Sequence, residues 1–193
     1  RRRVGGGQAG PRGIRGESGQ LQGFGRSGGG AYQLAFASFL NQNGIDPTTV
    51  PVVPSQGAAP GFQELVADGV AIVPSSLPEA ASMRDAGLVK TLAVLSADRL
   101  EAYPDIPTAQ EAVGTVSVGG TWRGVVGPAG LSEDVTGQLG EALAKVYRSD
   151  SFQEFMANRG FGVSWLPADE FKAFMMDATA SNADVIGKLG LKQ

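Results

Sequence analysis

The sequence has 193 residues, 42% of them hydrophobic, which is enough to bury a sizeable apolar core in one domain or two small lobes. It contains neither histidine nor cysteine, so an imidazole base, a thiolate nucleophile, disulfides and soft metal ligands are excluded. The formal net charge of −3 disfavours nucleic acid as a partner, because nucleic-acid-binding domains usually carry a basic face.

The first 26 residues have a composition of their own. They hold six of the 16 basic residues, one acid and many glycines, without helical or strand periodicity. We expect residues 1–26 to be an irregular Gly/Arg-rich segment, and a basic tail that contacts nucleic acid or membrane is the alternative. We find no apolar run of signal-peptide or membrane-span length, and hence no export signal in these residues.

Residues 27–117 predict helices that alternate with strands. Apolar side chains at helical spacing follow three glycines at residues 28–30 and stop at Asn43-Gly44, which predicts a helix. Further helices are expected over residues 60–67 and 77–86, and strands over residues 50–53, 70–73 and 89–95. Strands separated by helices favour a parallel sheet.

The remaining residues, 118–193, are expected to be mainly helical. A short helix opening at Pro107-Thr108 precedes an extended, hinge-like segment over residues 116–126. Ser132, followed by two acids, is a good N-cap for a helix with one apolar face. That face consists of Val135, Leu139, Leu143 and Val146. Helices over residues 151–158 and 168–189 flank a short strand over residues 162–165.

Two glycine patterns near residue 25 allow alternatives. Gly25-Arg26-Ser27-Gly28-Gly29 has the spacing of a nucleophile elbow, but the usual triad cannot form without histidine, which leaves only a lysine as a formal base. A small hydrolase that uses Ser27 therefore stays open as an alternative. Gly23, Gly25 and Gly28 have a dinucleotide-type spacing, although no strand is predicted immediately before them.

Three loops are candidate anion-binding sites. Each precedes a helix, so backbone N–H groups and the positive end of the helix dipole can face an anion. In a parallel sheet such loops lie beyond the carboxyl ends of the strands, at one edge. The candidate ligand-binding residues are Ser27, Gly28, Gly29, Gly30 and Ala31 in the first loop, Ser55, Gln56, Gly57 and Ala58 in the second, and Ser75 in the third.

These loops carry no cationic side chain, which suits reversible binding of a small anion better than covalent chemistry. The carboxylates of the chain are scattered, so no acid pair or metal cluster is predicted, and no cofactor. Trp122 is a weaker candidate for a ligand platform, because a tryptophan in an apolar stretch more often belongs to the core.

From residue 28 onwards, short motifs occur in a recognisable order and spacing. Their order identifies a resemblance to the substrate-binding proteins of tripartite tricarboxylate transporters, the TctC-like group often called Bug proteins. The motifs are Val53-Pro54-Ser55-Gln56-Gly57, Asp68-Gly69-Val70, the run from Ala86 to Ser96, Arg99, the run from Tyr103 to Thr108, the run from Trp122 to Gly130, and the run from Phe152 to Gly160.

The resemblance implies an α/β fold of the type II periplasmic binding proteins, with a parallel-sheet ligand-binding lobe over residues 27–117. Residues 118–193 would then supply a hinge strand and the C-terminal helical part of the other lobe. The lobes close on a small carboxylate by hinge motion, and the closed form delivers it to membrane permease subunits. The protein would be a periplasmic or extracytoplasmic monomer, and no enzyme.

The sequence departs from the family at two places. A complete member has an export signal and a long first-lobe segment without counterpart here, so we expect a truncated chain that binds its ligand weakly or not at all. Ser55 replaces the usual tyrosine of the second loop, and Gln56 replaces the usual lysine or glycine. A ligand-sensing domain of a regulator is a further alternative, which an upstream helix-turn-helix segment would decide.

Overall fold

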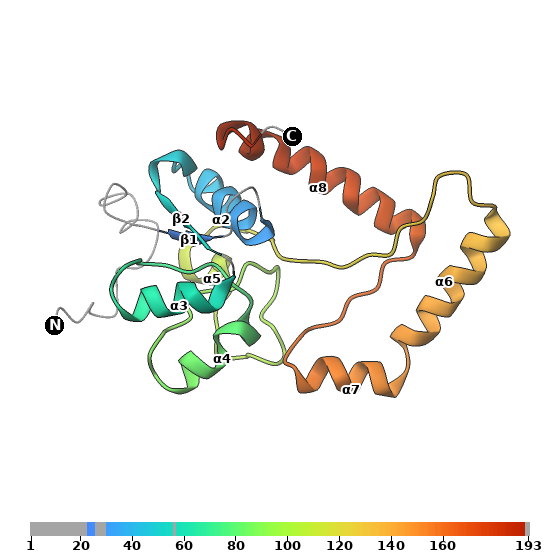
Figure 1. Ribbon diagram of the computed structural model, residues 1–193, viewed down its shortest axis with the longest axis horizontal. Coiled ribbons are helices and arrows are strands. Elements are labelled where there is room, and N and C mark those ends of the chain that lie inside the picture. Colours follow the sequence, from blue (N-terminus) through green and yellow to red (C-terminus); the bar gives the residue numbers. More distant parts are fainter. Residues whose placement is uncertain (1–22, 26–29, 56, 192–193) are drawn as a thin grey trace. The chain divides into compact units, whose positions relative to one another are not determined.

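The computed structural model describes residues 23–25, 30–55 and 57–191 (Figure 1). The chain divides into two compact units. The first unit consists of Arg1–Thr121 and Asn182–Gln193, and the second of Trp122–Ser181.

The first unit combines a pair of parallel strands with short helices. Strand β1 (Gly23–Gly25) pairs with β2 (Val52–Pro54), and Phe24 stands opposite Val53. The helical elements of this unit are α2 (Ala31–Gln42), the 3-10 helix η1 (Pro47–Thr49), α3 (Ala58–Val66), α4 (Leu77–Asp85), α5 (Ala109–Val113) and the end of α8 (Ala168–Lys188).

Two apolar clusters form the core of the first unit. In one of them, Phe36 and Leu40 of α2 pack with Ile45 and Val50, and Leu40 is 1% exposed. In the other, Phe62 of α3 packs with Ala80 of α4. Burial of such side chains stabilises a fold by about 1.5–3 kcal/mol each, so these clusters hold α2, α3 and α4 in place.

The second unit has helices but no buried core. It contains α6 (Glu133–Tyr147), α7 (Asp150–Asn158) and the first part of α8. The hydroxyls of Ser132 and Ser149 cap α6 and α7 by accepting from Val135 N–H and Phe152 N–H. Every residue of this unit is described, and none of them is buried. Local capping and helix propensity therefore shape this unit more than burial does.

The helices predicted from the sequence are confirmed to within a few residues. Asn43 and Gly44 end α2, and Gly87 and Gly160 adopt positive φ just after α4 and α7. Ser132, the predicted N-cap, caps α6, and Thr108, where a short helix was expected to open, caps α5.

The strand predictions were mostly wrong for the described residues, which are helical with little sheet. Residues 89–95 contribute only an isolated parallel bridge between Val94 and Thr108, and residues 162–165 form no strand. In 70–73 only Ile72 is a bridge residue, and 115–128 have no regular structure. An apolar, β-branched run becomes a strand only where another backbone pairs with it. At Val94 the backbone pairs instead with the entry of α5, since Val94 N–H donates to Pro107 and Val94 C=O accepts from Ala109.

One strand lies where the sequence pattern predicted none. Gly23–Gly25 falls inside the segment 1–26 that was expected to be irregular. Two of its three residues are glycines, which have low strand propensity, so local composition gave no sign of it. The strand forms because its backbone pairs with that of β2, which compensates for its low strand propensity. The division into ligand-binding lobes at residues 27–117 and 118–193 stays a prediction.

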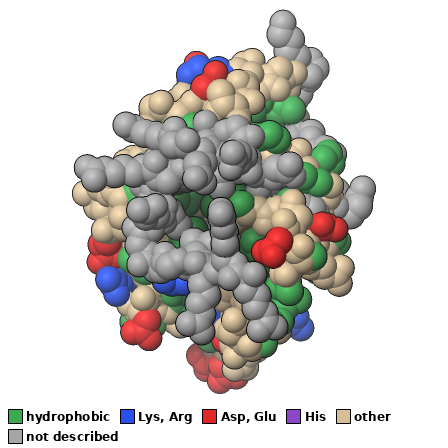
Figure 2. All heavy atoms as spheres, turned by 90° about the vertical axis from the view of Figure 1, so that its left-hand side faces the viewer, with side chains coloured by type: hydrophobic (Ala, Val, Ile, Leu, Met, Phe, Trp, Pro, Cys, Tyr) green, Lys and Arg blue, Asp and Glu red, His purple; other side chains and the backbone are tan. Residues whose placement is uncertain are grey.

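Charged side chains are dispersed on the face shown in Figure 2, as far as the described residues form it. Acidic and basic side chains alternate there with apolar and neutral ones rather than gathering into one patch. Among the described helices, none combines the length and the apolar character that crossing a membrane requires.

Candidate functional site

The parallel pair brings the carboxyl ends of two strands to the same edge. Gly25, the last residue of β1, stands opposite Pro54, the last residue of β2. Paired strands lie about 4.8 Å apart. Because the two strands are parallel, they point in the same direction, and the helices that follow them in the chain are α2 and α3. Two strand-to-helix loops therefore start side by side at the carboxyl ends of two parallel strands.

Glycine occupies the N-cap of both helices that follow these strands. Gly30 precedes α2 and Gly57 precedes α3, and a glycine has no side chain that could accept from the first-turn amides. Pro60 in the first turn of α3 has no N–H at all. The other helices with a described N-cap differ, because each begins with serine or threonine: Ser76 for α4, Thr108 for α5, Ser132 for α6 and Ser149 for α7. The N-termini of α2 and α3, which carry the positive end of the helix dipole, thus lack the side-chain cap that α4, α5, α6 and α7 have.

The second loop is a tight turn closed by Ser55. Its Oγ donates to the carbonyl of Gly57 at 2.7 Å and accepts from Gly57 N–H at 3.2 Å. Gly57 adopts φ 144°, a conformation that side-chain-bearing residues rarely reach. The Ser55 hydroxyl therefore shapes the turn, and its bonds are already used within the loop.

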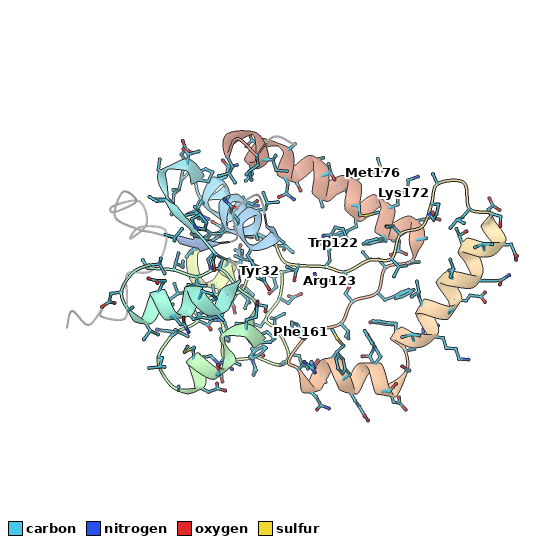
Figure 3. All side chains as sticks on the ribbon, in the orientation of Figure 1. Tyr32, Trp122, Arg123, Phe161, Lys172 and Met176 are labelled. Carbon is cyan, nitrogen blue, oxygen red and sulfur yellow. The ribbon has the colours of Figure 1, made fainter. Side chains whose placement is uncertain are left out.

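The third loop is tied to the first by a tyrosine. Tyr32, in the first turn of α2, donates its hydroxyl to Glu79 Oε2 at 2.6 Å. The same oxygen accepts from Ser76 Oγ at 2.7 Å and from Ser76 N–H at 3.1 Å. Figure 3 shows Tyr32 at the beginning of α2. The first turns of α2 and α4 are thus joined, and the carboxylate of Glu79 already occupies the positive end of α4.

The protonation states of this pair follow from their contacts. Burial acts to raise the pKa of Glu79, but hydrogen bonds from Tyr32 and Ser76 outweigh it and hold that pKa below its ordinary 4.5. Burial, followed by the bond to Glu79, raises the pKa of Tyr32 above its ordinary 10.0. Near neutral pH the tyrosine is therefore a donor and Glu79 a charged acceptor.

Of the predicted ligand-binding residues, six lie in the described part of the chain. Gly30 and Ala31 begin α2, while Ser55, Gly57 and Ala58 form the turn that leads from the end of β2 into α3. Ser75 lies just before α4, at an end already neutralised by Glu79. The rest of the predicted set lies outside the described residues: Ser27, Gly28, Gly29 and Gln56.

Sequence reasoning missed Tyr32 and Glu79. Tyr32 lies among the apolar side chains that predict its helix, but its hydroxyl needs a partner because the residue is half-buried. Glu79 stands three residues after Ser76, the spacing of a capping box, and that pattern could have indicated it.

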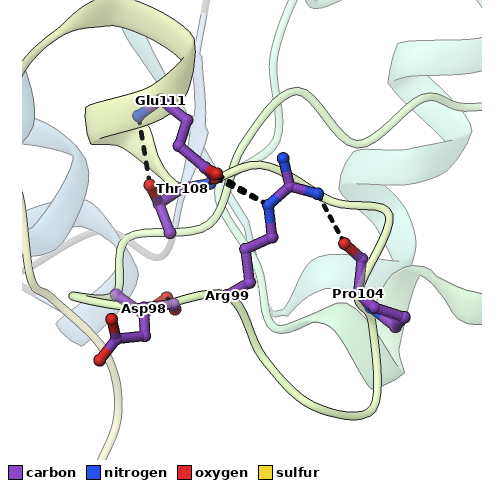
Figure 4. Close-up of polar contacts among 6 residues, drawn as sticks. Asp98, Arg99, Pro104, Thr108 and Glu111 are labelled. Carbon is purple, nitrogen blue, oxygen red and sulfur yellow. Dashed lines mark hydrogen bonds and ion pairs between the residues drawn. The ribbon is translucent and has the colours of Figure 1, made fainter.

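A second polar network stabilises the chain on either side of the Val94–Thr108 bridge (Figure 4). Arg99 Nε donates to both oxygens of Glu111 at 2.9 Å, and Arg99 Nη1 donates to the carbonyl of Pro104 at 2.7 Å. Glu111 also accepts from Thr108 N–H at 2.8 Å in a capping box. Arg99 belongs to the motif series of the family resemblance, and its role in the structure is to hold this loop.

Trp122 lies in the second unit, where it packs against α8 rather than in a core. Its ring meets those of Phe171 and Phe174 edge-on, with centroids 5.2 Å and 5.8 Å away, and it is 48% exposed (Figure 3). Gly124 lies so close to the ring of Phe171 that a Cβ would have no room. Within the described residues, no group of three or more acidic side chains could hold a metal ion.

Solved structures share this arrangement of elements. BugD, described as a periplasmic binding protein, matches with a TM-score of 0.68 at 21% identity, over 94% of this chain and 60% of its own. Rpa4515 of R. palustris, solved with adipate, matches with a TM-score of 0.67 at 21% identity, over 92% and 58%. MatC from Rhodopseudomonas palustris, solved with bound malate, gives 0.59 at 21% identity, over 92% and 58%. The fold is that of the Bug periplasmic binding proteins.

Sequence comparison identifies the family within this class. The model of the tripartite tricarboxylate transporter family receptor, TctC, matches residues 14–191. The chain belongs to this family of solute-binding proteins. It is 32% identical to a UPF0065 protein of Bordetella pertussis over 72% of its length, and 24% identical to Protein BugT of the same organism over 74%. It spans 43% and 44% of these two relatives.

Proposed function

We propose that the chain captures a small carboxylate outside the cytoplasm and delivers it to the permease subunits of a tripartite tricarboxylate-type membrane transporter. The observation that supports this most directly is the parallel pairing of β1 and β2, which places Gly25 opposite Pro54, together with the glycine N-caps of α2 and α3, the helices that follow these strands in the chain. A carboxylate at that edge would accept from backbone N–H groups and face the positive ends of two helix dipoles.

The ligand class is a dicarboxylate. Adipate and malate are the compounds in the two solved relatives, and each carries two carboxylates for two helix ends. Glu79 favours a ligand whose charge lies at α2 and α3 rather than at α4, because like charges repel. The ligand is bound and released unchanged, since the described residues of the turn before α3 offer a hydroxyl and backbone groups but no basic side chain.

The expected affinity of the chain is low. A helix N-terminus stabilises an anion by up to about 2 kcal/mol, so two ends give at most about 4 kcal/mol, which corresponds to a dissociation constant of about 1 mM or weaker. Backbone amide shifts in NMR detect binding in that range. We expect adipate and malate to shift the amide resonances of Gly30, Ala31, Gly57 and Ala58.

A pair of glycine variants tests the site. Gly57→Ala strains the turn before α3, where φ is 144°, whereas Gly87→Ala strains the turn after α4, where φ is 68°, and a Cβ meets no atom within 4 Å at either place. We expect Gly57→Ala to abolish the ligand-induced shifts and Gly87→Ala to leave them intact. The proposal fails if saturating dicarboxylate moves none of the four amides, or if the two variants behave alike.

A further inference from the structure

Glu79 places a carboxylate of the chain itself at the N-terminus of α4. Its Oε2 accepts from Ser76 N–H at 3.1 Å and from Ser76 Oγ at 2.7 Å. Glu79 is ionised near neutral pH, since its pKa in the folded chain lies below the ordinary value of 4.5. Two hydrogen-bond donors and the positive end of the helix dipole therefore already hold a negative charge at this end of α4.

The N-termini of α2 and α3 carry no such charge. Gly30 and Gly57 are their N-caps, and among the described residues no side chain caps either helix. Neither helix has an acidic residue in its first turn, whereas α4, α5, α6, α7 and α8 each have at least one. The chain thus leaves the positive ends of α2 and α3 without a negative charge of its own in the first turn, and neutralises that of α4.

The beginning of α4 is connected to the beginnings of both other helices. Tyr32, in the first turn of α2, donates its hydroxyl to Glu79 Oε2 at 2.6 Å. Ala58, the first residue of α3, shares one buried cluster with Ala80, the residue after Glu79. A ligand held at the N-termini of α2 and α3 would therefore have the carboxylate of Glu79 as a charged neighbour.

We propose that Glu79 is a specificity-determining residue, which makes the site accept dicarboxylates and reject tricarboxylates. The inference rests on the carboxylate-binding function proposed above. Two carboxylates of the ligand face α2 and α3, whereas a third would lie at the beginning of α4, where Glu79 already supplies the negative charge. Like charges that lie a few ångströms apart repel each other, so the third carboxylate weakens binding instead of strengthening it.

Three ligands separate the effect of charge from that of size. Citrate is malate with a carboxymethyl group in place of one hydrogen, and a monomethyl ester of citrate has the bulk of citrate with one negative charge fewer. The full chain is titrated with each ligand at constant ionic strength, and the four amides at the beginnings of α2 and α3 are followed by NMR. We expect similar dissociation constants for malate and the ester, and binding of citrate that is weaker by at least about tenfold.

Glu79→Gln tests the residue directly. The variant loses the charge but keeps an oxygen that can accept from Ser76 and Tyr32. We expect it to strengthen the binding of citrate by about tenfold and to leave that of malate within about threefold, because the charges of malate lie at α2 and α3. Glu79→Asp retains a negative charge in the first turn of α4 and should retain the discrimination.

Glu111→Gln is the matched control. Glu111 belongs to the capping box of α5, and its partners Thr108 and Arg99 lie outside the loops that precede α2, α3 and α4. The variant removes the same charge from the same kind of cap and should leave the ratio of the citrate and malate dissociation constants unchanged.

Failure of this inference is distinguishable from failure of carboxylate capture. If malate moves none of the four amides in the unaltered chain, the capture function fails, and the inference fails with it. If malate binds, three results overturn the inference alone: citrate binds as tightly as malate, the ester is rejected like citrate, or Glu79→Gln changes the citrate-to-malate ratio no more than Glu111→Gln does.

Discussion

The two units of this chain differ in burial rather than in helical pattern. Among the described residues, the buried apolar side chains, such as Leu40 and Phe62, all lie in the first unit, whereas most of the large exposed ones lie in the second. The helices α2 and α6 both have an apolar face, yet only the face of α2 is covered. An amphipathic pattern shows which side of a helix can be buried, and only a partner of matching shape buries it.

The largest difference between the two units is expected when one leucine is truncated in each and the loss of stability is compared. Leu40→Ala removes a side chain that is 1% exposed and should lower the free energy of unfolding by about 2–5 kcal/mol. Leu139→Ala removes one that is 52% exposed and should cost less than about 1 kcal/mol. Urea titrations of both variants measure the difference. Equal losses would mean that α6 is buried in solution.

Two glycine substitutions in the second unit should change its stability in opposite directions. A Cβ at Gly124 would collide with the ring of Phe171, so Gly124→Ala should cost about 1–3 kcal/mol and alter the fluorescence of the neighbouring Trp122. Gly140 lies within α6 with open space around it, so Gly140→Ala should stabilise by about 0.5–1 kcal/mol. If thermal unfolding shows that both variants are stabilised, or that both are destabilised, this description is contradicted.

Removal of one helix cap in each unit should give a smaller difference in stability. Thr108 caps α5 while 3% exposed, and its partner Glu111 also binds Arg99, so Thr108→Ala should cost about 1–2 kcal/mol. Ser132→Ala, at the exposed start of α6, should cost about 0.5–1 kcal/mol. Amide exchange distinguishes them, because the first loss should spread through the first unit and the second should stay within α6. Loss of protection in α2 upon Ser132→Ala would show that the units unfold together.

The smallest effect is expected from pH. The pKa of Glu79 is lower in the folded chain than in the unfolded one, so its contribution is present above pH 4.5 and is lost as pH falls through the folded pKa. Glu79→Gln should therefore flatten the acid side of the stability profile, which denaturation at about pH 3 to 6 would reveal. Tyr32→Phe removes one of the hydrogen bonds that lower this pKa and should flatten the profile in part. An unchanged profile in both variants would exclude a role for this contact.

Much of the local structure was predictable, because it depends on neighbours along the chain. Asn43-Gly44 ends α2, and Ser132 begins α6, since caps and left-handed turns act within a few residues. The glycine that precedes α3, Gly57, was predictable for the same reason. The strand over 89–95 was not, because pairing depends on a distant backbone that the sequence pattern does not reveal.

By itself, the sequence determined the helices, their caps, the glycine turns and, through its motifs, the family to which the chain belongs. Tertiary structure alone decided that Gly25 stands opposite Pro54, that Tyr32 bonds to Glu79, and that α6 stays uncovered. The reason is physical: propensity and capping act over a few residues, whereas pairing and burial join segments far apart in the chain.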